Sequence, residues 1–447
     1  MAKFICADRN QQTLMPYDIE DWLPQNHLAR FIVEIVSMLD FKHIYSQYKG
    51  SGSTAYDPRM LLSLLFYGYS TGVFSSRKIE QSTYDSVAFR FIAGNHHPDH
   101  DTISSFRKRF LPEIKGWFKE ILLIGKEMKL VRMGNIYIDG TKVQANASKH
   151  KAMSYDYMKR LEKQLETEIE QLLSLAAAKD EQEKELDLDI PKEIERRKDR
   201  LDKIRKAKEV VEARAQQRYE KEKKEYDTKV EKRKQQEETT GKKAKGRKPK
   251  APDSSPEASD QYNFTDPESR IMKTSSGFNQ CYNGQGVVND DMVIVGAYCN
   301  AHVNDKQEFI PAINSVPEEL GEISSAVADT GYFSEKNIDD CKNKGIKPII
   351  STAREKHNTY LENKLNGEDD IDYGDTPVDK MNQILKNKEG KDIYKKRKQT
   401  VEPVFGIIKE VLGFRRFSLR GEFETDCEWA LVCLGYNLKR FFKLSMA

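Results

Sequence analysis

The chain has 447 residues, enough to bury a sizeable core and to hold two or three domains. Charged residues make up 32% of it, but the net charge is only +3, so any basic surface must be local. The six cysteines form no Cys-x-x-Cys pair, which argues against a zinc ribbon or a disulfide framework. The first residues lack a signal-peptide core, and no apolar stretch reaches the roughly 20 residues that span a bilayer. We therefore expect a soluble, cytoplasmic protein with no membrane partner.

Residues 1–130 are predicted to be helical, because apolar residues recur there at helical spacing, notably over 28–39 and 61–66. Asp101 is predicted to cap a further helix, which carries Arg107 and Arg109 on an exposed face. A short helix, a turn and a second basic helix are typical of proteins that bind the major groove of DNA. An ordinary helical bundle with a solvated basic face explains the same pattern equally well.

A histidine cluster precedes this helix. His96, His97 and His100 lie beside Asp99 and Asp101, which are residue types that bind zinc. No cysteine is near in the sequence, and the stretch has the character of a turn before a capped helix. A structural role is therefore favoured over a zinc site.

Apolar, β-branched runs alternate with turn residues from Asn135 onward. We predict strands within 135–140, 284–299, 325–331 and 345–352, and helices at 306–313 and 334–344, the latter capped by Ser334. An Asn-Asp turn at 288–291 suits a hairpin between two antiparallel strands. Strands followed by alternation with helices predict a mixed α/β sheet.

A charged segment interrupts this α/β pattern between residues 155 and 250. Its apolar residues form two seams at heptad-like spacing, one at Leu161, Leu165, Ile169 and Leu172 and the other at Ile194, Leu201, Ile204, Val211 and Ala215. The stretch 187–191, which ends in proline, separates the two seams. We predict a helical hairpin of coiled-coil type, followed at 241–250 by a basic tract that is either a solvated loop or a nonspecific phosphate-binding segment.

Three acidic residues stand in settings that expose a carboxylate. Asp139 and Asp329 each follow a short apolar run, and Glu402 lies in a predicted helix. Carboxylates at the ends of buried strands lie where ligands bind in α/β sheets. Three of them, gathered by the fold, would form an all-oxygen site for two divalent cations, which suits phosphoryl transfer on nucleic acid. His302, Asn304 and Asp305 follow another predicted strand and either line the same pocket or form a plain loop.

The helix predicted around Glu402 has one apolar and one polar face. Val401, Val404, Phe405, Ile408 and Leu412 recur as a stripe that we expect to be buried. If the helix is continuous, Tyr394, Arg397, Glu402 and Lys409 share the opposite face. Cations beside a metal-binding acid make sense where an anionic backbone is held. A surface helix with ordinary ion pairs is the alternative.

The three acidic segments resemble those of the DDE transposases of bacterial insertion sequences. The matching stretches are IYIDGTKVQANASKHKAMSY, ADTGYFS, and Tyr-Arg-Glu-Lys with VEPVFGIIK. Two further stretches, NFTDPESRIMKTSSGFNQCYNGQ and RGEFETDCEWALVCLGYNLKR, are also similar to the family, as are YDPRMLLSLLFYGYSTGVFSSRKIE and HHPDHDTISSFRKRF of its N-terminal helical domain. In one departure, Arg397 lies five residues before Glu402, whereas the family spacing of four falls on Lys398.

The resemblance implies an RNase H-like core with a mixed sheet over 131–154 and 259–447, a helical DNA-binding domain over 1–130, and an inserted hairpin with its basic tract over 155–258. It implies that Asp139, Asp329 and Glu402 hold two Mg²⁺ or Mn²⁺ ions. Cleavage of transposon ends would free a 3′ hydroxyl that attacks target DNA. Tyr394, Lys409 and either Arg397 or Lys398 would contact the DNA strands. The implied partners are double-stranded DNA and a second copy of the chain, in association with the nucleoid.

Two rival functions have some support in the sequence. Asp329-Thr330-Gly331 matches the short motif of aspartic proteases, but Asp139-Gly140-Thr141 has the wrong order for the second copy that those enzymes need. A DNA-binding or scaffold protein derived from a transposase, with inert acids, is the other alternative. Cleavage of DNA in magnesium would separate it from an active enzyme.

Overall fold

The computed structural model describes residues 18–48, 54–182, 189–240, 248–352 and 376–446. It consists of two compact units, one of residues 1–145 with 281–447 and one of residues 146–280. Most of the predicted basic tract, residues 241–247, lies outside the described residues. The three-part division into functional domains remains a prediction.

The first unit begins with a group of helices: α1 (Leu28–Met38), α2 (Lys42–Ser46), α3 (Pro58–Thr71), α4 (Ser76–Asp85), α5 (Val87–Ile92), α6 (His100–Arg109) and α7 (Ile114–Glu127). The helices predicted at 28–39 and 61–66 are confirmed as α1 and part of α3. The predicted cap of α6 is wrong. Asp99, not Asp101, caps this helix, because its Oδ1 accepts a 2.6 Å hydrogen bond from the Thr102 amide.

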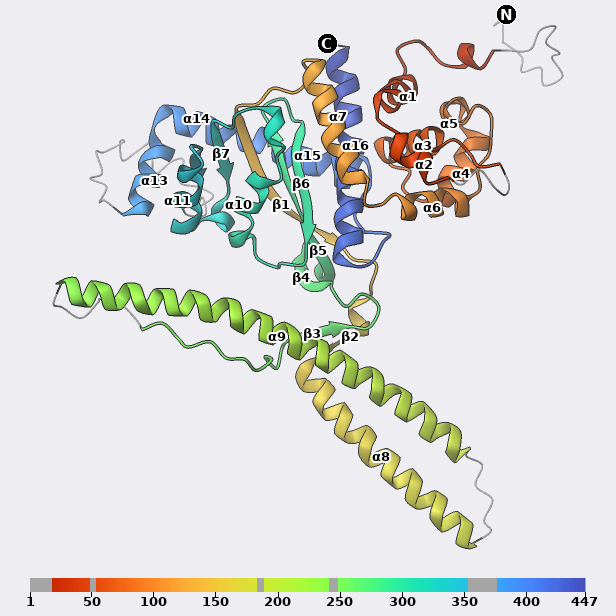
Figure 1. The fold of residues 1–447 in the computed structure, drawn as a ribbon, viewed down its shortest axis with the longest axis vertical. Coiled ribbons are helices and arrows are strands. Elements are labelled where there is room, and N and C mark those ends of the chain that lie inside the picture. Colours follow the sequence, from red (N-terminus) through yellow and green to blue (C-terminus); the bar gives the residue numbers. More distant parts are fainter. Residues whose placement is uncertain (1–17, 49–53, 183–188, 241–247, 353–375, 447) are drawn as a thin grey trace, which may run out of the picture. The chain divides into compact units, whose positions relative to one another are not determined.

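A mixed sheet forms the centre of the first unit (Figure 1). Its strands are β1 (Asn135–Gln144), β5 (Gly277–Asn289), β6 (Ile294–Asn300), β7 (Ser325–Ala328) and β8 (Lys347–Ile350). With β4 (Arg270–Thr274) at one edge, the order is β4-β5-β1-β7-β8, and β6 also pairs with β5. The strand β1 is antiparallel to β5 and parallel to β7. The predicted mixed α/β sheet and its β5–β6 hairpin are thus confirmed.

Helices and turns cover this sheet. They are α10 (Phe309–Asn314), α11 (Glu335–Asn343), α13 (Pro377–Lys386), α14 (Lys388–Lys396), α15 (Val401–Gly406) and α16 (Glu422–Ser445). The Ser334 cap of α11 is confirmed, because its hydroxyl oxygen accepts a hydrogen bond from the Asn337 amide. The α16 helix passes close to α3, where a side chain at Gly435 would meet the backbone of Tyr69 at 2.8 Å. The helical group and the sheet therefore share one core within this unit.

Glycines in β5 show which helices cover which face of the sheet. Gly286 lies opposite Asp139 of β1, and a Cβ at Gly286 would lie 2.9 Å from the Phe405 ring of α15. Gly284 approaches the Trp429 indole of α16 in the same way, at 2.9 Å. Because directly paired residues of adjacent strands point to the same face of a sheet, Asp139 lies on the face that α15 and α16 cover.

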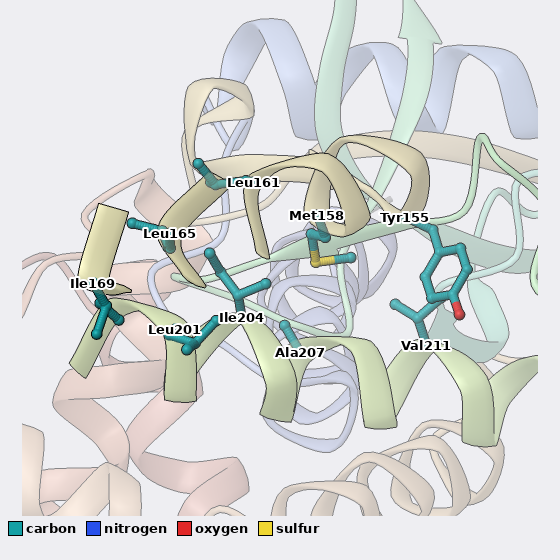
Figure 2. Close-up of a cluster of buried hydrophobic side chains, with 9 residues drawn as sticks. All are labelled: Tyr155, Met158, Leu161, Leu165, Ile169, Leu201, Ile204, Ala207 and Val211. Carbon is teal, nitrogen blue, oxygen red and sulfur yellow. The ribbon is translucent and has the colours of Figure 1, made fainter. Parts of the chain in front are cut away.

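The second unit contains two long helices, α8 (Tyr155–Gln182) and α9 (Ile190–Thr240). The small strand β2 (Ala152–Ser154), directly before α8 in the chain, pairs with β3 (Gln261–Asn263), and β4 (Arg270–Thr274) follows β3 in the chain. Figure 2 shows the buried side chains between the helices, which are Tyr155, Met158, Leu161, Leu165, Ile169, Leu201, Ile204, Ala207 and Val211. The predicted pair of helices and its seams are confirmed. Ion pairs such as Arg205 with Glu162 and Glu166 flank the apolar contact.

Within the described parts of the chain, no helix combines the length and the apolar character that crossing a membrane would need.

Candidate active site

Asp139 lies within the central strand β1. We expected the strand to end at this residue, which is wrong, since β1 continues to Gln144 through its pairing with β5. The Asp139 side chain is 17% exposed, and its Oδ1 accepts a 2.9 Å hydrogen bond from the Gly140 amide. The parallel register joins Tyr137 to Val327, so Asp139 stands level with the residue two beyond Val327. That residue is Asp329.

Asp329 and Glu402 are more open to solvent than Asp139. Asp329 follows the end of β7, as predicted, and its Oδ1 accepts a hydrogen bond from the Gly331 amide at 2.9 Å. Glu402 lies in the first turn of α15, which the buried side chains of Val401 and Val404 hold against the sheet. The Asp329 side chain is 43% exposed and that of Glu402 46%.

One buried guanidinium joins all three acids. Arg397 Nη2 lies 3.1 Å from Asp139 Oδ2 and 3.8 Å from Asp329 Oδ2, while Nη1 donates to Glu402 Oε1 at 3.0 Å. The Arg397 side chain is only 8% exposed. The sequence predicted that the acids come together, but not that Arg397 would turn inward between them.

The charges of this cluster influence one another. Burial raises the pKa of Asp139 to about 6; the Arg397 charge opposes that rise, and the nearby Asp329 carboxylate adds to it. Burial lowers the pKa of Arg397, but the charges of Asp139 and Asp329 outweigh it, so the net shift is upward. Arg397 therefore stays charged, and keeping Asp139 ionised costs free energy.

The predicted continuous helix around Glu402 is interrupted. A 3-10 turn, Arg397–Gln399, follows α14, and Thr400 leaves helical geometry before α15 begins. A π-helical turn, Ile407–Val411, then carries Lys409. The expected stripe, Val401, Val404, Phe405, Ile408 and Leu412, is buried throughout, which confirms that part of the prediction.

Three predicted DNA-contacting residues lie near this interruption. Lys409 is half-buried, and its Nζ donates to the backbone oxygen of Lys142 in β1 at 3.1 Å. Burial lowers the pKa of the Lys409 ammonium. Tyr394 is half-buried and Lys398 exposed. Only Lys398 of the two candidate bases therefore points outward, since Arg397 is held by the acids.

Two family models match the chain. Residues 17–109 match the Transposase domain (DUF772), and residues 250–438 match the Transposase DDE domain. The chain belongs to the DDE-type insertion-sequence transposases. The second match contains Asp329, Arg397, Glu402 and Lys409, whereas Asp139 lies between the two matched ranges. No curated protein and no solved structure matches the chain.

The helical part of the transposase departs from the sequence prediction at Arg107. We expected this side chain on an exposed face, which is wrong, because Arg107 is buried. Its Nη1 donates to the Tyr69 hydroxyl at 3.1 Å, and that hydroxyl lies 3.5 Å from the buried Glu428 carboxylate of α16. Arg109 is exposed as predicted, and its guanidinium covers the Tyr48 ring.

A polar network in the transposase covers the opposite face of β1 from Asp139. Asp305 Oδ1 accepts hydrogen bonds from Asn283 at 2.6 Å and Gln285 at 2.9 Å, and it lies 3.4 Å from Lys142 Nζ. A Cβ at Gly140 would lie 2.5 Å from Gln285 Nε2 and 2.8 Å from Asp305 Oδ1, so any larger residue there would have to displace these side chains. The sequence placed Asp305 either in the pocket or in a plain loop, and the structure places it behind the acidic strand.

Two histidines of the cluster have side-chain partners in the helical part of the transposase. His100 Nδ1 lies 2.8 Å from Glu80, and His97 lies 3.1 Å from the Thr83 hydroxyl and stacks on Tyr84. Among the described residues, no three His, Cys, Asp or Glu side chains are arranged to hold a metal ion as they stand.

The acidic cluster of the transposase nevertheless suits a divalent metal in its donor chemistry. Its ligating groups are three carboxylates, which are the donors that Mg²⁺ and Mn²⁺ prefer. All three contact a cation, the Arg397 guanidinium, which stands where a metal ion would neutralise the same charges.

Proposed function

We propose that this transposase cleaves transposon ends and transfers the freed 3′ hydroxyl into target DNA in a metal-dependent reaction. Asp139, Asp329 and Glu402 are the residues that would hold two Mg²⁺ or Mn²⁺ ions. The observation that carries the proposal is the gathering of these acids, from three distant segments, around one buried cation. Bound divalent ions would supply charge neutralisation at the phosphate and activation of the attacking oxygen.

The remaining roles belong to side chains around the acids. Gly140 and Gly331 donate backbone hydrogen bonds that orient the two aspartates. Lys409, together with Tyr394 and the exposed Lys398, would contact the DNA backbone near the cut. Each such contact positions the strand without reading its sequence.

The other parts of the chain have proposed roles as well. We assign residues 1–130 to DNA binding, 131–154 with 259–447 to an RNase H-like catalytic core, and 155–258 to an inserted hairpin. Arg109, an exposed residue of α6, is the proposed DNA contact in the first of these. The working form would be a homodimer on paired transposon ends at the nucleoid. The rival view of a catalytically inert scaffold gives no reason for three carboxylates to share one buried guanidinium.

Cleavage of end-containing DNA in magnesium tests the proposal. Asp329→Asn should bind this DNA and leave it uncut, because it removes a carboxylate that is 43% exposed and accessible to a cation. The matched control is Asp339→Asn, a change at an exposed acid of α11, which should cut like the wild type. Equal cutting by Asp329→Asn and the wild type would refute the assignment.

A further inference from the structure

We propose that Arg397 is a positioning residue that acts as an internal counter-ion: its guanidinium holds the three acids together in the metal-free protein and is displaced from them when divalent cations bind. The inference rests on the proposed function, since it takes Asp139, Asp329 and Glu402 as the metal ligands. It assigns to Arg397 a task other than the strand contact that the sequence suggested.

Contacts of the guanidinium show that it holds the acids in one place. Its two terminal nitrogens reach three carboxylates that come from β1, the end of β7 and α15. The β1–β7 ladder and the buried face of α15 set these segments beside one another, and the guanidinium offsets the repulsion between their carboxylates. Arg397 therefore keeps the acids near the arrangement that a metal would need.

The same contacts show that the fit is incomplete. Arg397 Nε is buried and has no hydrogen-bond partner among the described residues. The 3.8 Å separation of Nη2 from Asp329 is longer than a hydrogen bond. An unsatisfied buried N–H costs free energy, so part of the guanidinium would gain by moving to solvent or to a phosphate.

Charge makes the exchange with a metal favourable. Three carboxylates against one guanidinium leave a net charge of about −2 (3 negative, 1 positive), which attracts a divalent ion. A guanidinium and a divalent ion repel each other strongly at such distances. The guanidinium and a divalent ion therefore compete for the same position among the three carboxylates.

The surroundings of Arg397 allow its side chain to move away from the three acids. It lies on the short 3-10 turn between α14 and α15, and Thr400 breaks the helix directly after that turn. Asp329 and Glu402 are 43% and 46% exposed, so the cluster is open on their side. Displacement therefore requires a change of side-chain rotamer and no opening of the sheet.

Mn²⁺ binding to the full chain, without DNA, tests this inference by calorimetry and electron paramagnetic resonance. Arg397→Gln should lower the dissociation constant for Mn²⁺ by on the order of tenfold, because a competing positive charge has been removed. Arg397→Lys should give a smaller decrease than Arg397→Gln, because the lysine keeps a positive charge at the site although it cannot contact all three acids. An exposed lysine of α14 gives the control: Lys395→Gln should bind Mn²⁺ like the wild type.

The outcomes separate this inference from the proposed function. Asp329→Asn should weaken Mn²⁺ binding severely; if it does not, the proposed metal site is wrong and the inference falls with it. If Asp329→Asn weakens binding but the folded Arg397→Gln and Arg397→Lys variants bind Mn²⁺ no more tightly than the wild type, the counter-ion role alone is wrong. Circular dichroism shows which variants are folded, and Arg397→Lys keeps the comparison available if Arg397→Gln is not.

Discussion

Replacing Asp139 by asparagine should stabilise the metal-free protein above pH 6. The pKa of Asp139 is about 6 in the folded protein against an ordinary value of 3.8, because burial disfavours its charged form. The folded state therefore binds this proton more tightly than the unfolded state does. The stability that the proton contributes is fully present below about pH 4 and is lost as the pH rises through 6.

The size of the effect follows from that difference. A rise of about two units in the pKa of Asp139 corresponds to a free-energy difference of about 3 kcal/mol between its protonated and ionised forms. Because the side chain is only 17% exposed, solvent screening reduces this value only a little. An asparagine resembles the protonated carboxyl in shape and avoids this loss. Asp139→Asn should thus match the wild type near pH 4 and exceed it by about 2–3 kcal/mol at pH 7.5.

Urea unfolding in EDTA at several pH values measures this difference, with the exposed Asp339→Asn as the control that should show no pH-dependent difference. Added Mg²⁺ should raise the stability of the wild type and leave Asp139→Asn unchanged, because only the wild type keeps the full set of acids. A difference between Asp139→Asn and the wild type that is independent of pH, or of opposite sign at pH 7.5, would refute the reasoning.

Three further predictions concern packing. Gly284→Val should lower the free energy of unfolding by about 1–3 kcal/mol, because its side chain would meet the indole ring 2.9 Å away; Gly116→Val, with no atom within 4 Å, is the control in urea unfolding. Arg107→Ala should cost about 3 kcal/mol and thereby lower the melting temperature, because it removes a buried guanidinium that donates to Tyr69 and offsets the charge of the buried Glu428. Leu165→Ala should destabilise the helical hairpin by about 2–5 kcal/mol, whereas the half-exposed Leu173→Ala should change it by about 0.5 kcal/mol or less, as followed by helical circular dichroism.

Much of the fold was predictable because local patterns decide it. Apolar runs marked the strands, and Ser334 marked the start of α11 through its hydroxyl. The heptad-like seams marked the two hairpin helices, whose charged faces leave only one side to bury. In each of these elements, the side chains within one short window determine both the structure and the buried face.

The sequence predictions failed where contacts between distant segments determine the structure. Asp139 looked like the end of a strand, but the partner strand β5 extends the ladder to Gln144. Arg107 looked solvated, although it lies four residues after the buried Ile103 and so shares its face of α6. The spacing of four from Ile103 therefore indicated that Arg107 would be buried.

The interruption before Glu402 also had an indication in the sequence. Pro403 has no N–H to donate, so it is tolerated in the first turn of a new helix and not in the interior of a longer one. Nothing in the sequence indicated that the Arg397 side chain would turn inward, because its position depends on acids brought together by the fold. At its spacing of five, across the 3-10 turn and Thr400, Arg397 lies 3.0 Å from Glu402.

Locating Mn²⁺ by its anomalous scattering in crystals of the full chain tests the central claim most directly. We predict manganese peaks within about 2.0–2.2 Å of carboxylate oxygens from Asp139, Asp329 and Glu402 together. Manganese bound elsewhere, or bound here with one of the three acids out of coordinating reach, would contradict the assignment of this cluster as the active site.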